Sequence, residues 1–154
     1  MTDQILEQWH EQLRVIPYNR ELDMRFGELT ERGCVLCLPY RNDLIGDPES
    51  GALHVGAIAA LIDTTFGYSV YRRIGERRGF ATLDLRIEHL HRSTAGQDIF
   101  CIGDCHKVTA DLAFVRGRVY HDDPAAPIAT AVGIFMFTGG VLPMASGKDV
   151  NDAV

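Results

Sequence analysis

The chain has 154 residues, of which 46% are hydrophobic and 23% are charged, and its formal net charge is −6. This length and composition are typical of one globular domain with its own hydrophobic core. An acidic chain lacks the clustered positive charge that binds nucleic acids or anionic membranes, so the composition argues against both partners.

The polar first 14 residues do not resemble a signal peptide, and no uncharged apolar run is long enough to span a bilayer. We therefore expect a cytoplasmic protein in which residues 1–154 form a single domain.

The first half of the chain combines a short amphipathic helix, two strands and a long buried helix. Apolar residues recur at helical spacing near the N-terminus, and Pro17 ends that pattern. The long helix has no proline and is apolar on nearly every side, which is typical of burial. The expected elements are a helix in the N-terminal segment 1–14, strands at 23–29 and 33–40, a turn-rich loop at 42–51 and a helix at 54–73.

The second half of the chain has the period-two pattern of strands. In 81–91, Leu83, Leu85 and Ile87 alternate with charged residues, which predicts a strand with one covered face. Further strands are expected at 98–108, 111–121 and 127–138, joined by hairpin turns, with a flexible tail at 139–154. A long helix followed by an antiparallel sheet that wraps around it is an α+β fold. Pairing of two sheets edge to edge in a symmetric dimer would cover the edge strands.

The four cysteines do not have the spacing of a metal site. Cys34 and Cys37 lie in an expected strand, where residues three apart point to opposite faces. Cys105 and His106 have no matching second pair of ligands. We interpret the cysteines as reduced, buried apolar residues, and we expect no metal ion.

Asp63 is the most informative residue of the long helix. A carboxylate in this apolar segment is costly unless it is hydrogen-bonded or partly solvated in a cleft. Gly56, Ala60 and Gly67 share its face of the helix, so another surface or a ligand can approach closely. The alternative is a structural aspartate that only ties its helix to a neighbouring backbone. The small residues on this face do not distinguish that role from a role in a ligand site.

His54 lies at the expected start of the same helix. The first turn of a helix has free N–H groups and a partial positive charge, which suit an anion or a developing oxyanion. By itself, His54 is explained as well by a capping or core histidine.

The segment 51–63 resembles the signature of the phenylacetate-degradation-type (PaaI-like) hotdog thioesterases. In that family a Leu-His-Gly-Gly segment opens the central helix and an acid lies nine positions after the histidine, the spacing of His54 and Asp63. The similarity extends over roughly 44–137, including the strand that begins near Thr82. It implies a hotdog fold, in which an antiparallel sheet wraps around one long central helix.

The resemblance implies a hydrolase that cleaves an acyl-CoA thioester to a free acid and CoA. Asp63 matches the family's general base or nucleophile, and the backbone N–H groups of Val55 and Gly56 match the oxyanion hole. His54 matches a residue that orders this corner of the site, and Thr82 a hydroxyl that assists the acid. The family needs no cofactor beyond the CoA of its substrate, and its site lies at the interface of a homodimer or a dimer of dimers (a homotetramer).

Four residues are expected to contact the substrate. The apolar surface around Phe66 would hold the acyl group, and Leu53 and His89 would line the site. Arg92, like Arg86 and Lys107, would meet the CoA phosphates at the rim, and a solvated strand charge is the alternative for each. His89 and His91 share a strand face, where rim histidines are a simpler interpretation than a metal pair.

The chain departs from the family pattern at several positions. Val55 replaces the first glycine, which is compatible with a backbone N–H donor if φ is negative. Pro48 stands where related enzymes often have an asparagine, and His89 and Arg92 replace an aromatic residue and a proline. By strict alternation Thr82 lies on the polar face, so a β-bulge or the partner subunit must bring it to Asp63. The nearby polar residues that would substitute for the asparagine are Asn42, Asp47 and Ser50, and the sequence does not choose among them.

Two other functions remain open at this level. One is a hydratase or dehydratase of enoyl or 3-hydroxyacyl thioesters, which also pairs an acid with a histidine near a helix start. The other is a non-catalytic acyl-CoA binding protein, which the departures at Val55 and Pro48 favour slightly. No basic arm or DNA-binding helix pair is visible in the sequence.

Overall fold

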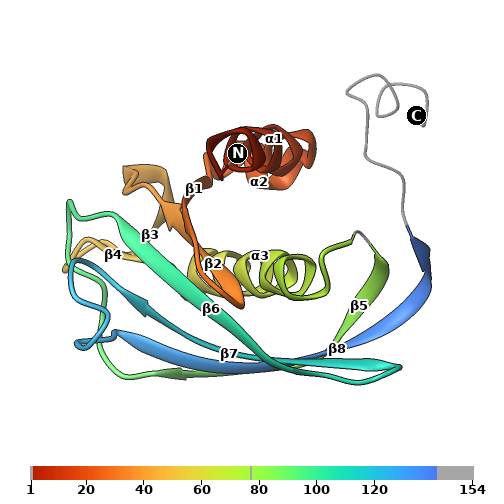
Figure 1. The fold of residues 1–154 in the computed structure, drawn as a ribbon. Coiled ribbons are helices and arrows are strands. Elements are labelled where there is room, and N and C mark those ends of the chain that lie inside the picture. Colours follow the sequence, from red (N-terminus) through yellow and green to blue (C-terminus); the bar gives the residue numbers. More distant parts are fainter. Residues whose placement is uncertain (1, 77, 142–154) are drawn as a thin grey trace.

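The structure is a computed structural model that describes residues 2–76 and 78–141 (Figure 1). Its helices are α1 (Thr2–Val15), α2 (Pro17–Glu21), the 3-10 helix η1 (Asn42–Leu44) and α3 (Val55–Ile74). Its strands are β1 (Arg25–Leu29), β2 (Gly33–Leu38), β3 (Ile45–Asp47), β4 (Ala52–Leu53), β5 (Arg78–His89), β6 (Ile99–Val108), β7 (Leu112–Tyr120) and β8 (Ala129–Val141).

The main sheet is antiparallel and has six strands in the order β1-β2-β6-β7-β8-β5. It curves around α3, which lies along its concave side (Figure 1). The expected α+β architecture, a sheet wrapped around one long central helix as in a hotdog fold, is confirmed. The helix is apolar on most sides because the sheet covers one side and the N-terminal helices cover part of the other.

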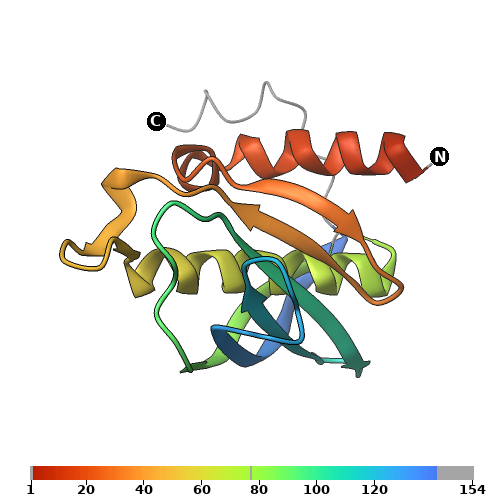
Figure 2. The same cartoon turned by 90° about the vertical axis from the view of Figure 1, so that its left-hand side faces the viewer.

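The two N-terminal helices lie over α3 on the side away from β7 and β8, as both views show (Figures 1 and 2). Trp9 of α1 contacts the rings of Phe26 and Tyr68, with ring centroids 5.9 and 5.7 Å apart. Aromatic pairs at this distance add to the free energy gained by burial. This contact holds the N-terminal segment against the middle of α3.

Phe66 packs α3 against the sheet. Its side chain is fully buried, and its ring occupies the space that glycines leave on three neighbouring strands, Gly103, Gly117 and Gly133. A Cβ atom at Gly117 would lie 2.5 Å from the Phe66 ring, closer than any real contact. The expectation that the surface around Phe66 holds the acyl group is therefore wrong, because the ring is sealed in the core.

The segment 42–51 is more ordered than the expected loop. It contains η1 and strand β3, which forms a short hairpin with β4. The short helix α2, which begins at Pro17, was not expected from the sequence; proline is favoured at the first helical position because its φ is preset. Strand β5 begins at Arg78, before the expected 81, and β8 continues to Val141, so 139–141 belong to a strand. The rest of the expected tail lies outside the described residues.

None of the helices in the described ranges is long and apolar enough to cross a membrane.

Candidate active site

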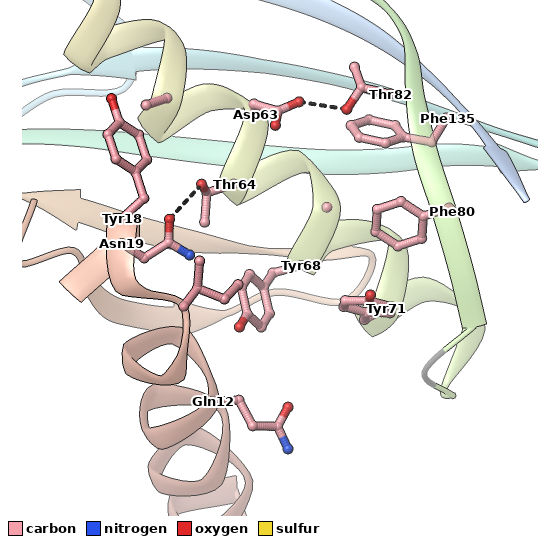
Figure 3. Close-up of a pocket in the computed structure, with 13 residues that line it drawn as sticks. Gln12, Tyr18, Asn19, Asp63, Thr64, Tyr68, Tyr71, Phe80, Thr82 and Phe135 are labelled. Carbon is pink, nitrogen blue, oxygen red and sulfur yellow. Dashed lines mark hydrogen bonds between the residues drawn. The ribbon is translucent and has the colours of Figure 1, made fainter. Parts of the chain in front are cut away.

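A cavity of about 350 Å³ opens between α2, α3 and strand β5 (Figure 3). Its walls combine one carboxylate with a few hydroxyl and amide groups and many aromatic rings. The lining residues are Gln12, Ile16, Tyr18, Asn19, Ala60, Asp63, Thr64, Gly67, Tyr68, Tyr71, Phe80, Thr82 and Phe135. A mostly apolar cavity with a few convergent polar groups is the usual form of a small-molecule site.

Asp63 and Thr82 form the polar centre of this cavity. The Thr82 hydroxyl donates a hydrogen bond of 2.8 Å to Oδ1 of Asp63, which is half-buried (Figure 3). In the described part of the chain Asp63 has no other hydrogen-bond or ion-pair partner, so its second oxygen is unpaired, and the residue lines the cavity. The bond joins Asp63 to a side chain of β5 rather than to neighbouring backbone.

A β-bulge in β5 brings Thr82 to Asp63. Thr82 pairs with Phe135 and Asp84 with Ile134, so Leu83 is an extra residue in the ladder. The bulge that strict alternation required is thus confirmed, within a single chain. Because of the bulge, Leu83 does not point toward the covered face, and it is 58% exposed. The expectation that Leu83 shares the covered face is therefore wrong.

His54 caps the start of α3. Its Nδ1 accepts a hydrogen bond of 2.9 Å from the Gly56 N–H. An accepting Nδ1 requires the proton of a neutral imidazole to lie on Nε2. The capping interpretation of His54 is confirmed, and the Gly56 N–H is not free. The expectation that Gly56 contributes a free donor to an oxyanion hole is therefore wrong.

The N–H of Val55, the first residue of α3, has no acceptor in the described part of the chain. The φ angle of Val55 is negative. Valine can therefore replace glycine at this position without backbone strain, and its N–H can act as the donor. Its side chain is 53% exposed. The helix end therefore offers one unsatisfied donor beside an exposed apolar side chain.

A second cavity, of about 600 Å³, lies at the start of α3. Its lining includes five of the residues expected at the site from the sequence, Leu53, His54, Val55, His89 and Arg92. Leu53 is almost completely buried, and its N–H donates to the Ser93 hydroxyl at 2.8 Å.

The residues considered as substitutes for the family's asparagine do not project free groups into either cavity. Asp47 accepts a hydrogen bond from Ser50 at 2.7 Å and pairs with Arg92 at 2.9 Å. The Ser50 hydroxyl, the Glu49 N–H and the charge of Arg92 lower the pKa of Asp47. Asn42 is exposed in η1 and lines neither cavity.

The two cavities divide the residues expected at one site. Asp63 lies eight residues after Val55 on α3, a separation of about 12 Å along the helix axis. Asp63 and Thr82 line the first cavity, whereas His54, Val55, His89 and Arg92 line the second. Within one chain, the acid and the free helix-end amide cannot contact the same carbonyl group.

Most of the residues that line the first cavity were not predicted from the sequence. Tyr71 lies eight residues after Asp63, on the same helical face, so helical spacing could have identified it. Tyr18 and Asn19 carry no comparable signal, because only the packing of α2 over α3 brings them to the cavity.

Within 2–76 and 78–141, no group of three or more His, Cys, Asp and Glu side chains is arranged to hold a metal ion. The four cysteines are free thiols, and burial raises the pKa of Cys34 and Cys101 to about 12. Such thiols are poor nucleophiles.

Comparison with known proteins connects these features to a family. Residues 50–128 match the family model of the thioesterase superfamily. The chain is 38% identical to a protein of Pseudomonas aeruginosa of known crystal structure, with a TM-score of 0.77 over 86% of this chain and 98% of that one. A search of curated protein sequences finds no match.

Two more distant structures share the fold. The PaaI protein from the phenylacetic acid degradation operon of Escherichia coli has 13% identity and a TM-score of 0.78, over 92% of this chain and 99% of that chain. A thioesterase of Haemophilus influenzae has 15% identity and a TM-score of 0.76, over 87% and 90% of the two chains.

Proposed function

The chain belongs to the thioesterase superfamily and has a PaaI-like hotdog fold, and from this premise we propose that it is an acyl-CoA thioesterase. The reaction is hydrolysis of the thioester to a free acid and CoA. The observation that carries the proposal is the Asp63–Thr82 pair in the wall of an open, mostly apolar cavity.

Asp63 is the proposed catalytic carboxylate. The hydrogen bond from Thr82 occupies Oδ1 and orients the group, which leaves Oδ2 for the reaction. As a general base, Asp63 takes a proton from water while the water oxygen attacks the thioester carbon. The C–S bond then breaks, and the proton passes to the departing CoA sulfur. Direct attack by the carboxylate, followed by hydrolysis of the anhydride, gives the same products.

The Val55 N–H is the proposed oxyanion donor. It lies at the positive end of α3, where a developing negative charge is stabilised. His54 would order this donor by capping the helix through Gly56, with its Nε2 proton directed away from the cap.

A homodimer would bring the acid of one subunit to the helix end of the other. This part of the proposal is supported by the separation of about 12 Å between Asp63 and Val55 within one chain. It is also supported by β5, an edge strand of the main sheet that pairs only with β8 among the described residues. Leu83, Leu90 and Val55 expose about half of their side chains at or near this edge, which a second subunit would cover. A dimer of dimers is compatible with the same arrangement.

The second cavity is the proposed entry for CoA. Arg92 is exposed at its rim, where it pairs with Asp47, and His89 lies in its wall, so both side chains can reach the thioester arm and its phosphates. Hydrolysis needs only water as the second reactant, so the proposal includes no metal or redox cofactor. It also places the enzyme in the cytoplasm, where CoA thioesters are metabolised.

The test is thiol release from short, long and aromatic acyl-CoAs by the wild-type protein and by Asp63→Asn. We expect Asp63→Asn to lose about 100-fold or more of kcat, because asparagine cannot accept the proton or attack carbon. Asp84→Asn is the matched control, since Asp84 is an exposed acid on the same strand as Thr82 and lines neither cavity. It should retain wild-type turnover.

Normal turnover by Asp63→Asn would remove Asp63 from its role. Hydration of enoyl-CoA without thiol release would identify a hydratase instead. Tight acyl-CoA binding without either reaction would identify a binding protein.

A further inference from the structure

Asn19 is a buried amide in the wall of the Asp63 cavity. Only 4% of its surface is exposed, and it reaches the cavity from α2, outside the segment matched by the family model. Figure 3 shows it beside Thr64, the residue that follows Asp63 on α3. Asn19 thus lies close to the proposed catalytic carboxylate, but on a different element.

The donor group of this amide is unused. The Thr64 hydroxyl donates to Oδ1 of Asn19 over 3.4 Å. An asparagine side chain also has an NH₂ group with two donors. Across the described ranges, no protein group accepts a hydrogen bond from this NH₂. Buried polar groups are normally paired, and an unpaired one costs stability, so a donor left in a cavity wall points to a partner within the cavity.

Most of the remaining wall of this cavity is apolar and aromatic. Tyr68, Tyr71, Phe80 and Phe135 form a continuous series of ring contacts, with successive centroids 5.9, 4.8 and 5.4 Å apart. Rings pack best against the faces and edges of other flat groups. The wall therefore fits an aryl body, and Asn19 contributes an unpaired donor at its side.

We propose that Asn19 is a specificity-determining residue, which selects aryl acyl groups that carry an oxygen acceptor. This inference rests on the proposed function, because it assigns the cavity to the acyl group of the thioester. The acyl oxygen accepts a hydrogen bond from the Asn19 NH₂ while the carbonyl carbon lies at Asp63. An acyl group without such an oxygen leaves the buried donor unpaired and is discriminated against.

The experiment compares benzoyl-CoA derivatives with a methoxy or an ethyl group at the 2, 3 or 4 position of the ring. These substituents have nearly the same shape, but only methoxy accepts a hydrogen bond. Wild-type protein should prefer methoxy over ethyl by about tenfold in kcat/KM at one ring position at least. In Asn19→Leu the preference should disappear, mainly through loss of the methoxy rate. Gln8→Leu, which removes an exposed amide from α1, should retain the preference.

The affinities of the same methoxy and ethyl compounds for the Asp63→Asn variant are measured by calorimetry. This measurement does not depend on turnover. Equal kcat/KM and equal affinity for methoxy and ethyl at all three positions would overturn the inference and leave the proposed hydrolysis intact. A methoxy preference in binding without any hydrolysis by the wild type would support the inference and overturn the proposed function. The comparison within wild type does not require Asn19→Leu to fold.

Discussion

The two sides of helix α3 differ in packing although they lie on one apolar helix. On the sheet side, Phe66 fills the space above three glycines and is completely buried. On the side toward α2, Asp63 and Gly67 border a cavity of about 350 Å³. Asp63 and Phe66 are only three residues apart. Close packing on one side of a helix can thus hold it rigidly while the other side stays open for a ligand.

The largest expected effect is on the sheet side. Phe66→Ala leaves a cavity among the sheet glycines that the surrounding strands cannot fill by small movements. We expect a loss of about 3–5 kcal/mol in the free energy of unfolding, measured by urea denaturation. Where the variant is folded, its relative rates on different acyl-CoAs should match the wild type, since Phe66 does not line the cavity. A changed acyl preference with unchanged stability would contradict this division of the helix.

An intermediate effect is expected on the open side. Thr82→Val keeps the shape of the side chain but removes the hydrogen bond to Asp63. Turnover of acyl-CoA should fall about tenfold, the value of one hydrogen bond to a charged group. Thr82→Ser keeps the hydroxyl and should restore most of the rate.

Thr130→Val is the matched control for this prediction. Thr130 also donates to a carboxylate, that of Glu88 at 3.3 Å, but it lies outside the Asp63 cavity. Its turnover should stay near the wild-type value. An equal loss of rate in both variants would show that Thr82 acts on the sheet rather than on Asp63.

The smallest effect is expected at Gly67, and the same substitution at Gly117 distinguishes the two sides of the helix. A Cβ atom at Gly67 would contact the Phe80 ring at 3.4 Å, an ordinary distance, whereas at Gly117 it would collide with Phe66. Gly67→Ala should stabilise the protein by about 0.5–1 kcal/mol, because alanine is the better helix former, and should raise KM for bulky acyl groups. Gly117→Ala should destabilise it by about 1–3 kcal/mol. Thermal unfolding of both variants would refute the comparison if the shifts had the same sign.

Much of the fold follows from patterns within short stretches of sequence. The uninterrupted apolar run predicted α3, and period two predicted the strands from β5 to β8, because both periods arise from local backbone geometry. The spacing of His54 and Asp63 pointed to the proposed site through its resemblance to the family signature. The capping role of His54 is local as well, since it bonds the N–H two residues ahead.

The sequence by itself therefore determined the long helix, the strands of the main sheet, their order along the chain, and the two polar residues at the start and in the middle of α3. Only the tertiary structure decided which groups meet. A one-residue bulge in β5 brought Thr82 to Asp63 and exposed Leu83, and three glycines on separate strands placed Phe66 in the core. The docking of α2 on α3 brought Asn19 to the cavity. These contacts join residues 19 to 67 positions apart in the chain, where no helical or strand period connects one side chain to another.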